Sequence, residues 1–88
     1  MRLLNGQIIS GNFDQDINKF SVMKIKQFST QTVLNEKQTS SLYYYLKSHS
    51  DEEDGQIVTL YDQMPIKLSQ NEVGGLIEDL ERIRKMYI

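Results

Sequence analysis

The chain contains no cysteine, one histidine and one proline in its 88 residues. The lack of cysteine excludes a disulfide framework, a thiolate zinc site and a cysteine nucleophile. No run of about 18 apolar residues is present, so the sequence predicts no membrane-spanning helix. The N-terminus becomes polar directly after Leu3 and Leu4, so we expect no signal peptide. These absences favour a cytoplasmic protein with no membrane association.

Length and charge indicate one small domain, 1–88, with an uneven charge distribution. The net charge of −2 divides into +3 for residues 1–50, with six basic and three acidic side chains, and −5 for residues 51–88, with four basic and nine acidic side chains. Such a charge dipole can steer a charged partner or stack copies of the chain head to tail. The simpler interpretation is that the charges only solvate the surface.

Two segments have the pattern of capped amphipathic helices. In each segment, a capping residue is followed three positions later by Gln or Glu, which is the pattern of a capping box: Asn35 with Gln38, and Ser69 with Glu72. Apolar residues then recur at helical spacing, so we expect a helix over 35–49 and a second helix after residue 69. Two glycines in the second helix, Gly74 and Gly75, are unfavourable there, and we expect them to permit a close approach by a neighbouring element or a partner.

Stretches with β character precede both predicted helices. They cover residues 6–10 and 20–28 before the first helix, and residues 57–61 and 64–68, joined by a turn at 62–63, before the second. Asn5 and Gly6 together form a type I′ hairpin signal. Residues 11–18 are expected to form an exposed loop.

The predicted fold class is α+β, a small and mainly antiparallel sheet with two helices on one face, in the order β-β-α-β-β-α. The two helices match at a constant offset of 34 residues. This similarity favours two diverged ββα units, 1–50 and 51–88. Strand–strand–capped helix is also a common local solution, so the similarity does not establish a repeat.

Catalytic and metal-binding motifs are missing from the sequence. Asp14, Asp16 and Asn18 have the spacing that opens a calcium loop, but the sixth and twelfth positions of that loop lack the required glycine and glutamate. The four adjacent acids at 51–54 are more typical of a solvated turn. His49 has no triad geometry within its own segment and is expected to close its helix. We therefore expect no enzyme, with no catalytic, cofactor-binding or metal-binding residues.

Nucleic-acid binding has one sequence feature in its favour. Aromatic and basic side chains alternate along one predicted strand: Phe20, Lys24, Lys26 and Phe28. Aromatic platforms with basic flanks bind single strands, but an isoelectric point near 5.3 is unlike that of nucleic-acid-binding domains. We expect the phenylalanines to lie in the core and nucleic acid to be the least favoured binding partner.

Three consecutive tyrosines are the most informative feature of the sequence. Successive helical residues point about 100° apart, so three in a row cannot face one core. If Leu42, Leu46 and His49 mark the buried stripe, Tyr44 points away from the core. An exposed tyrosine between two half-exposed ones is typical of a contact surface, although a lone exposed aromatic needs no such explanation. We expect a partner-binding surface that also includes the apolar C-terminus: Tyr43, Tyr44, Tyr45, Met86, Tyr87 and Ile88.

These features favour a non-enzymatic protein-interaction module that self-associates. One specific form is a phage-type assembly factor or chaperone that shields hydrophobic helical segments of a partner. Two alternatives remain open, a one-to-one regulator or inhibitor of a host factor and, less favoured, a single-stranded nucleic-acid binder. The expected partners are a hydrophobic or helical protein and further copies of the chain, as in a homo-oligomer.

Overall fold

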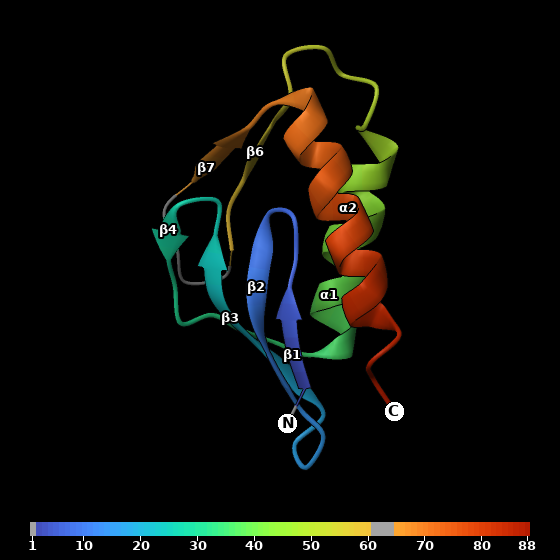
Figure 1. The fold of residues 1–88 in the computed structure, drawn as a ribbon. Coiled ribbons are helices and arrows are strands. Elements are labelled where there is room, and N and C mark those ends of the chain that lie inside the picture. The colour runs from blue at the N-terminus through green and yellow to red at the C-terminus, as the bar shows by residue number, and fades with distance from the viewer. Residues whose placement is uncertain (1, 61–64) are drawn as a thin grey trace.

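The computed structural model describes residues 2–60 and 65–88 and has an α+β fold (Figure 1). Its elements follow the order β-β-β-β-β-α-β-β-α, which confirms the predicted fold class. Five strands precede the first helix instead of the predicted two, because residues 2–5 form a strand of their own and two further strands are only two residues long.

Five antiparallel strands form the larger sheet: β1 (Arg2–Asn5), β2 (Ile9–Asp14), β3 (Lys19–Ile25), β4 (Phe28–Ser29) and β5 (Val33–Leu34). Their order is β1-β2-β3-β4, and β5 also pairs with β3. Two further strands, β6 (Gln56–Val58) and β7 (Ile66–Leu68), form a separate antiparallel pair. They overlap the predicted strands at 57–61 and 64–68 but are shorter, since residues 59 and 60 are not in a strand, and the predicted turn at 62–63 lies outside the described residues.

Both helices begin where their capping boxes predict, and the first also ends where the sequence predicts. Helix α1 (Glu36–Ser48) starts after Asn35 and closes at His49, and helix α2 (Gln70–Arg84) starts after Ser69. Each predicted capping box is complete, since the cap side chain accepts the N3 amide hydrogen and the N3 side chain accepts the cap amide hydrogen. The helices lie side by side on the same side of the strands (Figure 1). The contact between Ser40, near the start of α1, and Arg84, at the end of α2, shows that the two helices run in opposite directions.

The predicted exposed loop at 11–18 is wrong, because only residues 15–18 form a turn. Ile9, Gly11 and Phe13 alternate on the buried face of β2, and Phe13 is fully buried. The alternation is not visible in the sequence, because the buried position between Ile9 and Phe13 is a glycine, Gly11. It lies against Phe20 and the backbone of Ser21, where a side chain would collide with β3.

The first hairpin turn lies where Asn5 and Gly6 predict it, but it is not of type I′. That type needs positive φ at both central residues, and among the described residues only Asn18, Lys26 and Gly55 have positive φ. The turn is instead closed by the Gly6 amide, which donates to the Ile9 carbonyl at 2.9 Å.

One hydrophobic core lies between the sheets and the helices, and it includes residues from both halves of the chain. Strands β2 and β3 contribute Ile9, Phe13, Phe20, Val22 and Ile25 to this core. Each helix contributes one stripe, Tyr43 and Leu46 from α1 and Val73, Leu76, Leu80 and Ile83 from α2. The opposite face of the larger sheet is not covered by the helices, and it presents apolar side chains such as Leu3 and Met23 to solvent. The fold therefore buries only one face of the sheet.

A buried carboxylate joins the last helix to the first hairpin. Asp79 is fully buried on the apolar stripe of α2. Its Oδ1 accepts the amide hydrogen of Gln7 at 2.9 Å, and its Oδ2 accepts those of Ile8 and Ile9 at 2.7 and 3.0 Å. A buried carboxylate is costly unless donors satisfy it, and here three backbone amides of the β1–β2 turn do so.

Two glycines allow this close approach. A Cβ atom on Gly6 would lie 2.5 Å from the Asp79 carboxyl carbon, and one on Gly75 would lie 3.1 Å from the side-chain oxygen of Gln7. Gly75 therefore permits the approach of the hairpin to α2, as the sequence predicts. Gly74 has no such role, because nothing lies within 4 Å of the position that its Cβ would take.

We expect Asp79→Asn to lower the free energy of unfolding by about 3 kcal/mol. The substitution removes the charge from the hydrogen bonds with the three backbone amides, and the new side-chain NH2 group faces backbone N–H donors with which it cannot form a hydrogen bond. Urea unfolding measures this loss. Glu78→Gln is the matched control, since Glu78 is exposed and its carboxylate accepts a hydrogen bond from the side chain of Gln7. Equal stability of the two variants would contradict the structural role of Asp79.

We expect Gly74→Ala to raise the free energy of unfolding by about 1 kcal/mol, because alanine is the better helix former and the position is open. Gly75→Ala should gain less or lose stability, because its methyl group would press on Gln7 and Ile8, 3.1 to 3.4 Å away. Thermal unfolding of the two variants checks this order. A larger gain at Gly75 would show that the hairpin does not need the close approach.

Candidate protein-interaction surface

The three tyrosines of α1 lie in three different environments. Tyr44 and Tyr45 are 56% and 50% exposed, whereas Tyr43 is only 6% exposed. The buried stripe of α1 consists of Thr39, Tyr43 and Leu46 and not of the expected Leu42, Leu46 and His49. The stripe is rotated because α2 covers Tyr43 and because Thr39, although polar, satisfies its buried hydroxyl by donating to the carbonyl of Asn35 at 2.9 Å.

Arg84 of α2 holds two of the tyrosines in place. Its guanidinium carbon lies 4.3 Å from the ring centroid of Tyr43 and 4.8 Å from that of Tyr44, which is cation–π distance. Its Nη2 donates to the Tyr44 hydroxyl at 2.9 Å, and its Nη1 lies 3.5 Å from the Glu81 carboxylate. The rings of Tyr43 and Tyr44 also meet edge to face at 5.2 Å. The side chain of Tyr44 is therefore exposed to solvent, but its contacts with Arg84 and Tyr43 hold it in one orientation.

The hydroxyl of Tyr43 lies in a polar network at the edge of the helix pair. Lys47 Nζ donates to it at 3.2 Å, and this hydrogen bond raises the pKa of Lys47. A hydrogen bond from the same hydroxyl lowers the pKa of Glu81. Both side chains thus stay charged beside Tyr43, and the polar end of this largely buried residue reaches the surface.

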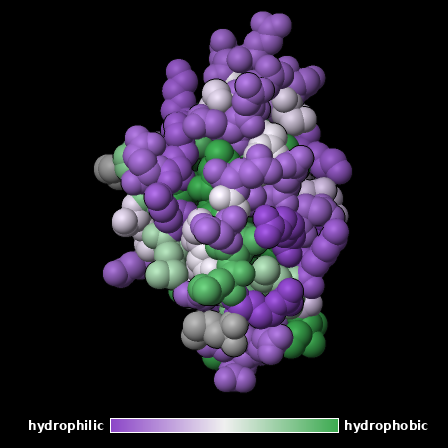
Figure 2. Space-filling model, viewed as in Figure 1, coloured by the Kyte–Doolittle hydropathy of each residue, from purple (hydrophilic) through white to green (hydrophobic). Residues whose placement is uncertain are grey.

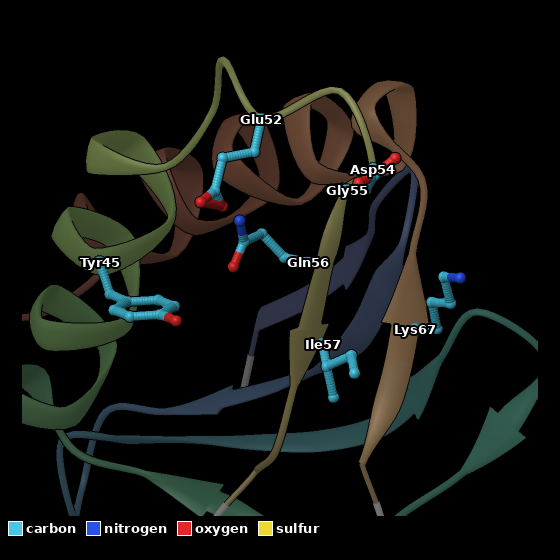
Figure 3. Close-up of a pocket in the computed structure, with 7 residues that line it drawn as sticks. All are labelled: Tyr45, Glu52, Asp54, Gly55, Gln56, Ile57 and Lys67. Carbon is cyan, nitrogen blue, oxygen red and sulfur yellow. The ribbon is translucent and has the colours of Figure 1, made fainter.

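Tyr45 forms one wall of an open hollow of about 380 Å³ between the end of α1, the acidic turn and β6 (Figure 3). Its ring meets that of His49 at 4.5 Å. In Figure 3, Tyr45 extends from α1 toward β6, and Glu52 and Gln56 lie between them. Ile57, on β6, is 63% exposed and adds the second apolar wall. The hollow thus combines two exposed apolar side chains with a mainly acidic rim, formed by Glu52 and Asp54 together with Lys67 of β7.

Apolar side chains also reach the surface away from this hollow. Figure 2 shows one face that is mostly hydrophilic, with hydrophobic residues in an interrupted band down its middle. In the described part of the chain, the exposed large apolar side chains are Leu3, Ile17, Met23, Phe28, Val33, Tyr44, Tyr45, Ile57 and Ile88. Tyr45 and Ile57 are the two of these that share a hollow.

The C-terminal residues of the predicted surface are used mainly inside the fold. Met86 is buried, and Tyr87 donates its hydroxyl to the Leu34 carbonyl at 2.8 Å while its ring meets Phe13 edge to face at 5.2 Å. Ile88 is 85% exposed, and its amide donates to Asn18 Oδ1 at 3.0 Å. Of the six residues expected to bind a partner, the structure exposes three, Tyr44, Tyr45 and Ile88, and does not bring Ile88 to the hollow.

The other candidate residues remain apart from this surface. In the turn with calcium-loop spacing, Asp14 accepts the amide hydrogen of Asp16. Within residues 2–60 and 65–88, no three acidic or histidine side chains are placed to hold a metal ion. Of the aromatic and basic residues with nucleic-acid spacing, Phe20 is fully buried as expected, whereas Phe28 is 40% exposed and not in the core as expected. Lys26 pairs with Glu72 at 3.2 Å.

Comparison of the chain with family models, curated proteins and solved structures finds no match. No helix in the described part of the chain is long and apolar enough to span a membrane.

Sequence reasoning missed two residues of the surface, Arg84 and Ile57. Arg84 lies 40 residues from Tyr44, so no local pattern connects them. The exposure of Ile57 follows from the alternation of a β-strand, because its neighbours Gln56 and Val58 are both buried on the other face. An isoleucine on the outward side of such a strand indicates an exposed apolar position.

We expect Tyr87→Phe to lower the free energy of unfolding at neutral pH by about 1 kcal/mol, through loss of the hydrogen bond to Leu34. Burial raises the pKa of Tyr87 above its ordinary value, with the charge of Glu36 adding to the rise. The wild-type advantage is therefore fully present below about pH 10, where the unfolded chain ionises, and is lost as pH rises through the folded pKa.

Urea unfolding of both proteins at neutral pH and above about pH 10 measures this difference. Tyr45→Phe is the control, because it removes a hydroxyl from a half-exposed side chain of α1. If the difference in the free energy of unfolding between wild type and Tyr87→Phe does not become smaller at alkaline pH, the burial of the Tyr87 phenol is contradicted.

Proposed function

We propose that the protein is a non-enzymatic protein-interaction module that self-associates through the surface formed by Tyr44, Tyr45 and the hollow beside Ile57. The observation that carries this proposal is the exposure of two adjacent tyrosines whose orientation other residues fix. Arg84 holds Tyr44, and His49 lies against Tyr45. Oriented aromatic side chains lose little conformational freedom on binding, so more of their contact energy remains as affinity.

The composition of the surface supports this proposal. Tyrosine and arginine are enriched among residues that dominate interface energetics. The polar ends of both aromatic side chains suit a contact that is partly wet and partly apolar. The acidic rim of Glu52 and Asp54 favours a binding segment that is apolar with basic flanks.

Within this function, the specific form that we favour is a cytoplasmic assembly factor or chaperone of the phage type, which covers apolar segments of a hydrophobic or helical partner. A one-to-one regulator of a host factor would use the same surface without self-association. The size of the protein in solution distinguishes the two forms. Single-strand binding has less support, because Phe20 is buried and Lys26 is paired with Glu72.

We expect the wild-type chain to form dimers or larger species as its concentration rises, and Tyr45→Ser to weaken this association about tenfold or more. Tyr44→Ser should weaken it as well. Sedimentation velocity or size-exclusion chromatography with light scattering measures both effects.

The control is Ile17→Ser, which removes an equally exposed apolar side chain (57%) from the turn between β2 and β3. It should associate like the wild type. A wild-type monomer at every concentration would overturn self-association in favour of the one-to-one form. Unchanged association of both tyrosine variants, with the fold intact by circular dichroism, would show that the tyrosines are not the contact.

A further inference from the structure

A second apolar surface lies on the uncovered face of the larger sheet. Residues paired directly across adjacent strands project to the same face. Leu3 pairs with Asn12, Asn12 with Ser21 and Ser21 with Val33, so these four side chains form one row across β1, β2, β3 and β5.

At the two ends of this row, Leu3 is 79% exposed and Val33 is 45% exposed. Met23 joins the row from the irregularity where β2 and β3 shift register. The Met23 sulfur lies 3.0 Å from Nδ2 of the Asn12 side chain, and the Met23 side chain is 54% exposed. We name Leu3, Met23 and Val33 the sheet patch.

The charge beside the sheet patch is basic. Lys24 follows Met23, pairs with Ser10 on the same outward face and is exposed. Lys19, farther along β3, pairs with Asp14, so these two charges offset each other. The hollow beside Tyr45 and Ile57 has a mainly acidic lining, since Glu52 and Asp54 of the exposed acidic turn at 51–54 outnumber one lysine, Lys67.

We propose that the sheet patch of one copy docks in the hollow of the next, so that the chain assembles head to tail. This proposal rests on the proposed function and names the partner of the hollow, a second copy of the chain. The apolar side chains Leu3, Met23 and Val33 would cover Tyr45 and Ile57, and Lys24 would face the acidic rim. The contact would bring a lysine of the basic first half of the sequence, +3 for residues 1–50, against two acids of the second half, −5 for residues 51–88.

A contact in which each surface meets its own copy suits these surfaces less well. A two-fold interface of that kind places the hollow against the hollow or the sheet patch against the sheet patch. Two hollows in contact would oppose their acidic rims, and two sheet patches would oppose their lysines, and like charges across an interface are unfavourable. A head-to-tail contact pairs opposite charges instead, and it produces either a ring or an open chain of copies.

Two variants that each block one surface test this geometry. Ile57→Asp places a charge in the hollow, and Met23→Asp places one on the sheet patch. Each variant alone should remain a monomer of 10.3 kDa. Mixed in equal amounts, they should form a 1:1 dimer and nothing larger, because each supplies the surface that the other lacks. Sedimentation velocity of the separate and mixed samples measures this.

The control Ile17→Asp changes an exposed isoleucine in the turn at 15–18, outside both surfaces, and should assemble like the wild type. Lys24→Glu should weaken assembly, and adding salt should weaken the wild-type assembly in the same direction. Circular dichroism of every variant separates loss of contact from loss of fold.

The outcomes separate the two proposals. Monomeric Ile57→Asp together with fully assembling Met23→Asp would overturn the head-to-tail geometry and leave the interaction surface standing. Failure of the two monomeric variants to combine would also overturn the geometry, since mixing restores a contact only where the two different surfaces bind each other. Full assembly of Ile57→Asp would overturn the hollow as a contact, and with it both proposals.

Discussion

The carboxylate of Asp79 is the interaction on which the arrangement of the protein depends. It connects α2 to the turn between β1 and β2 across about 70 residues of sequence, through three backbone amide hydrogens. Such a group is tolerated in a core only when its donors are in place. The hydrogen bonds therefore select one position of α2 against the sheet, which apolar packing alone would specify less sharply because apolar contact has little directionality.

The interaction surface follows from that position. Because α2 lies beside the first hairpin, Arg84 at its end reaches the start and middle of α1, where it contacts Ser40 and Tyr44. The same contact covers Tyr43, whereas Tyr44 and Tyr45 stay exposed. The orientation of Tyr44 thus depends on a hydrogen-bonded carboxylate at the other side of the helix, five residues before Arg84.

Local signals in the sequence predicted the helices well and the surface only in part. Capping boxes depend on residues three positions apart, so Asn35 and Ser69 marked both helix starts correctly. The phase of the buried stripe in α1 depends on contacts with α2, and the expected Leu42 and His49 gave way to Thr39 and Tyr43. The exposure of Tyr44 was predictable from helical geometry alone, whereas the partner that orients it was not.

An uncovered sheet face gives self-association a consequence for stability. A chain of this size buries a smaller share of its surface than a larger domain, so its stability is marginal. Here the sheet is covered on one side only, and Leu3, Met23 and Val33 remain in water. If a neighbouring copy covers them, assembly stabilises the folded state by mass action, because the unfolded chain has no such surface to bind. Folding and assembly are then linked, and the concentration of the protein sets its stability.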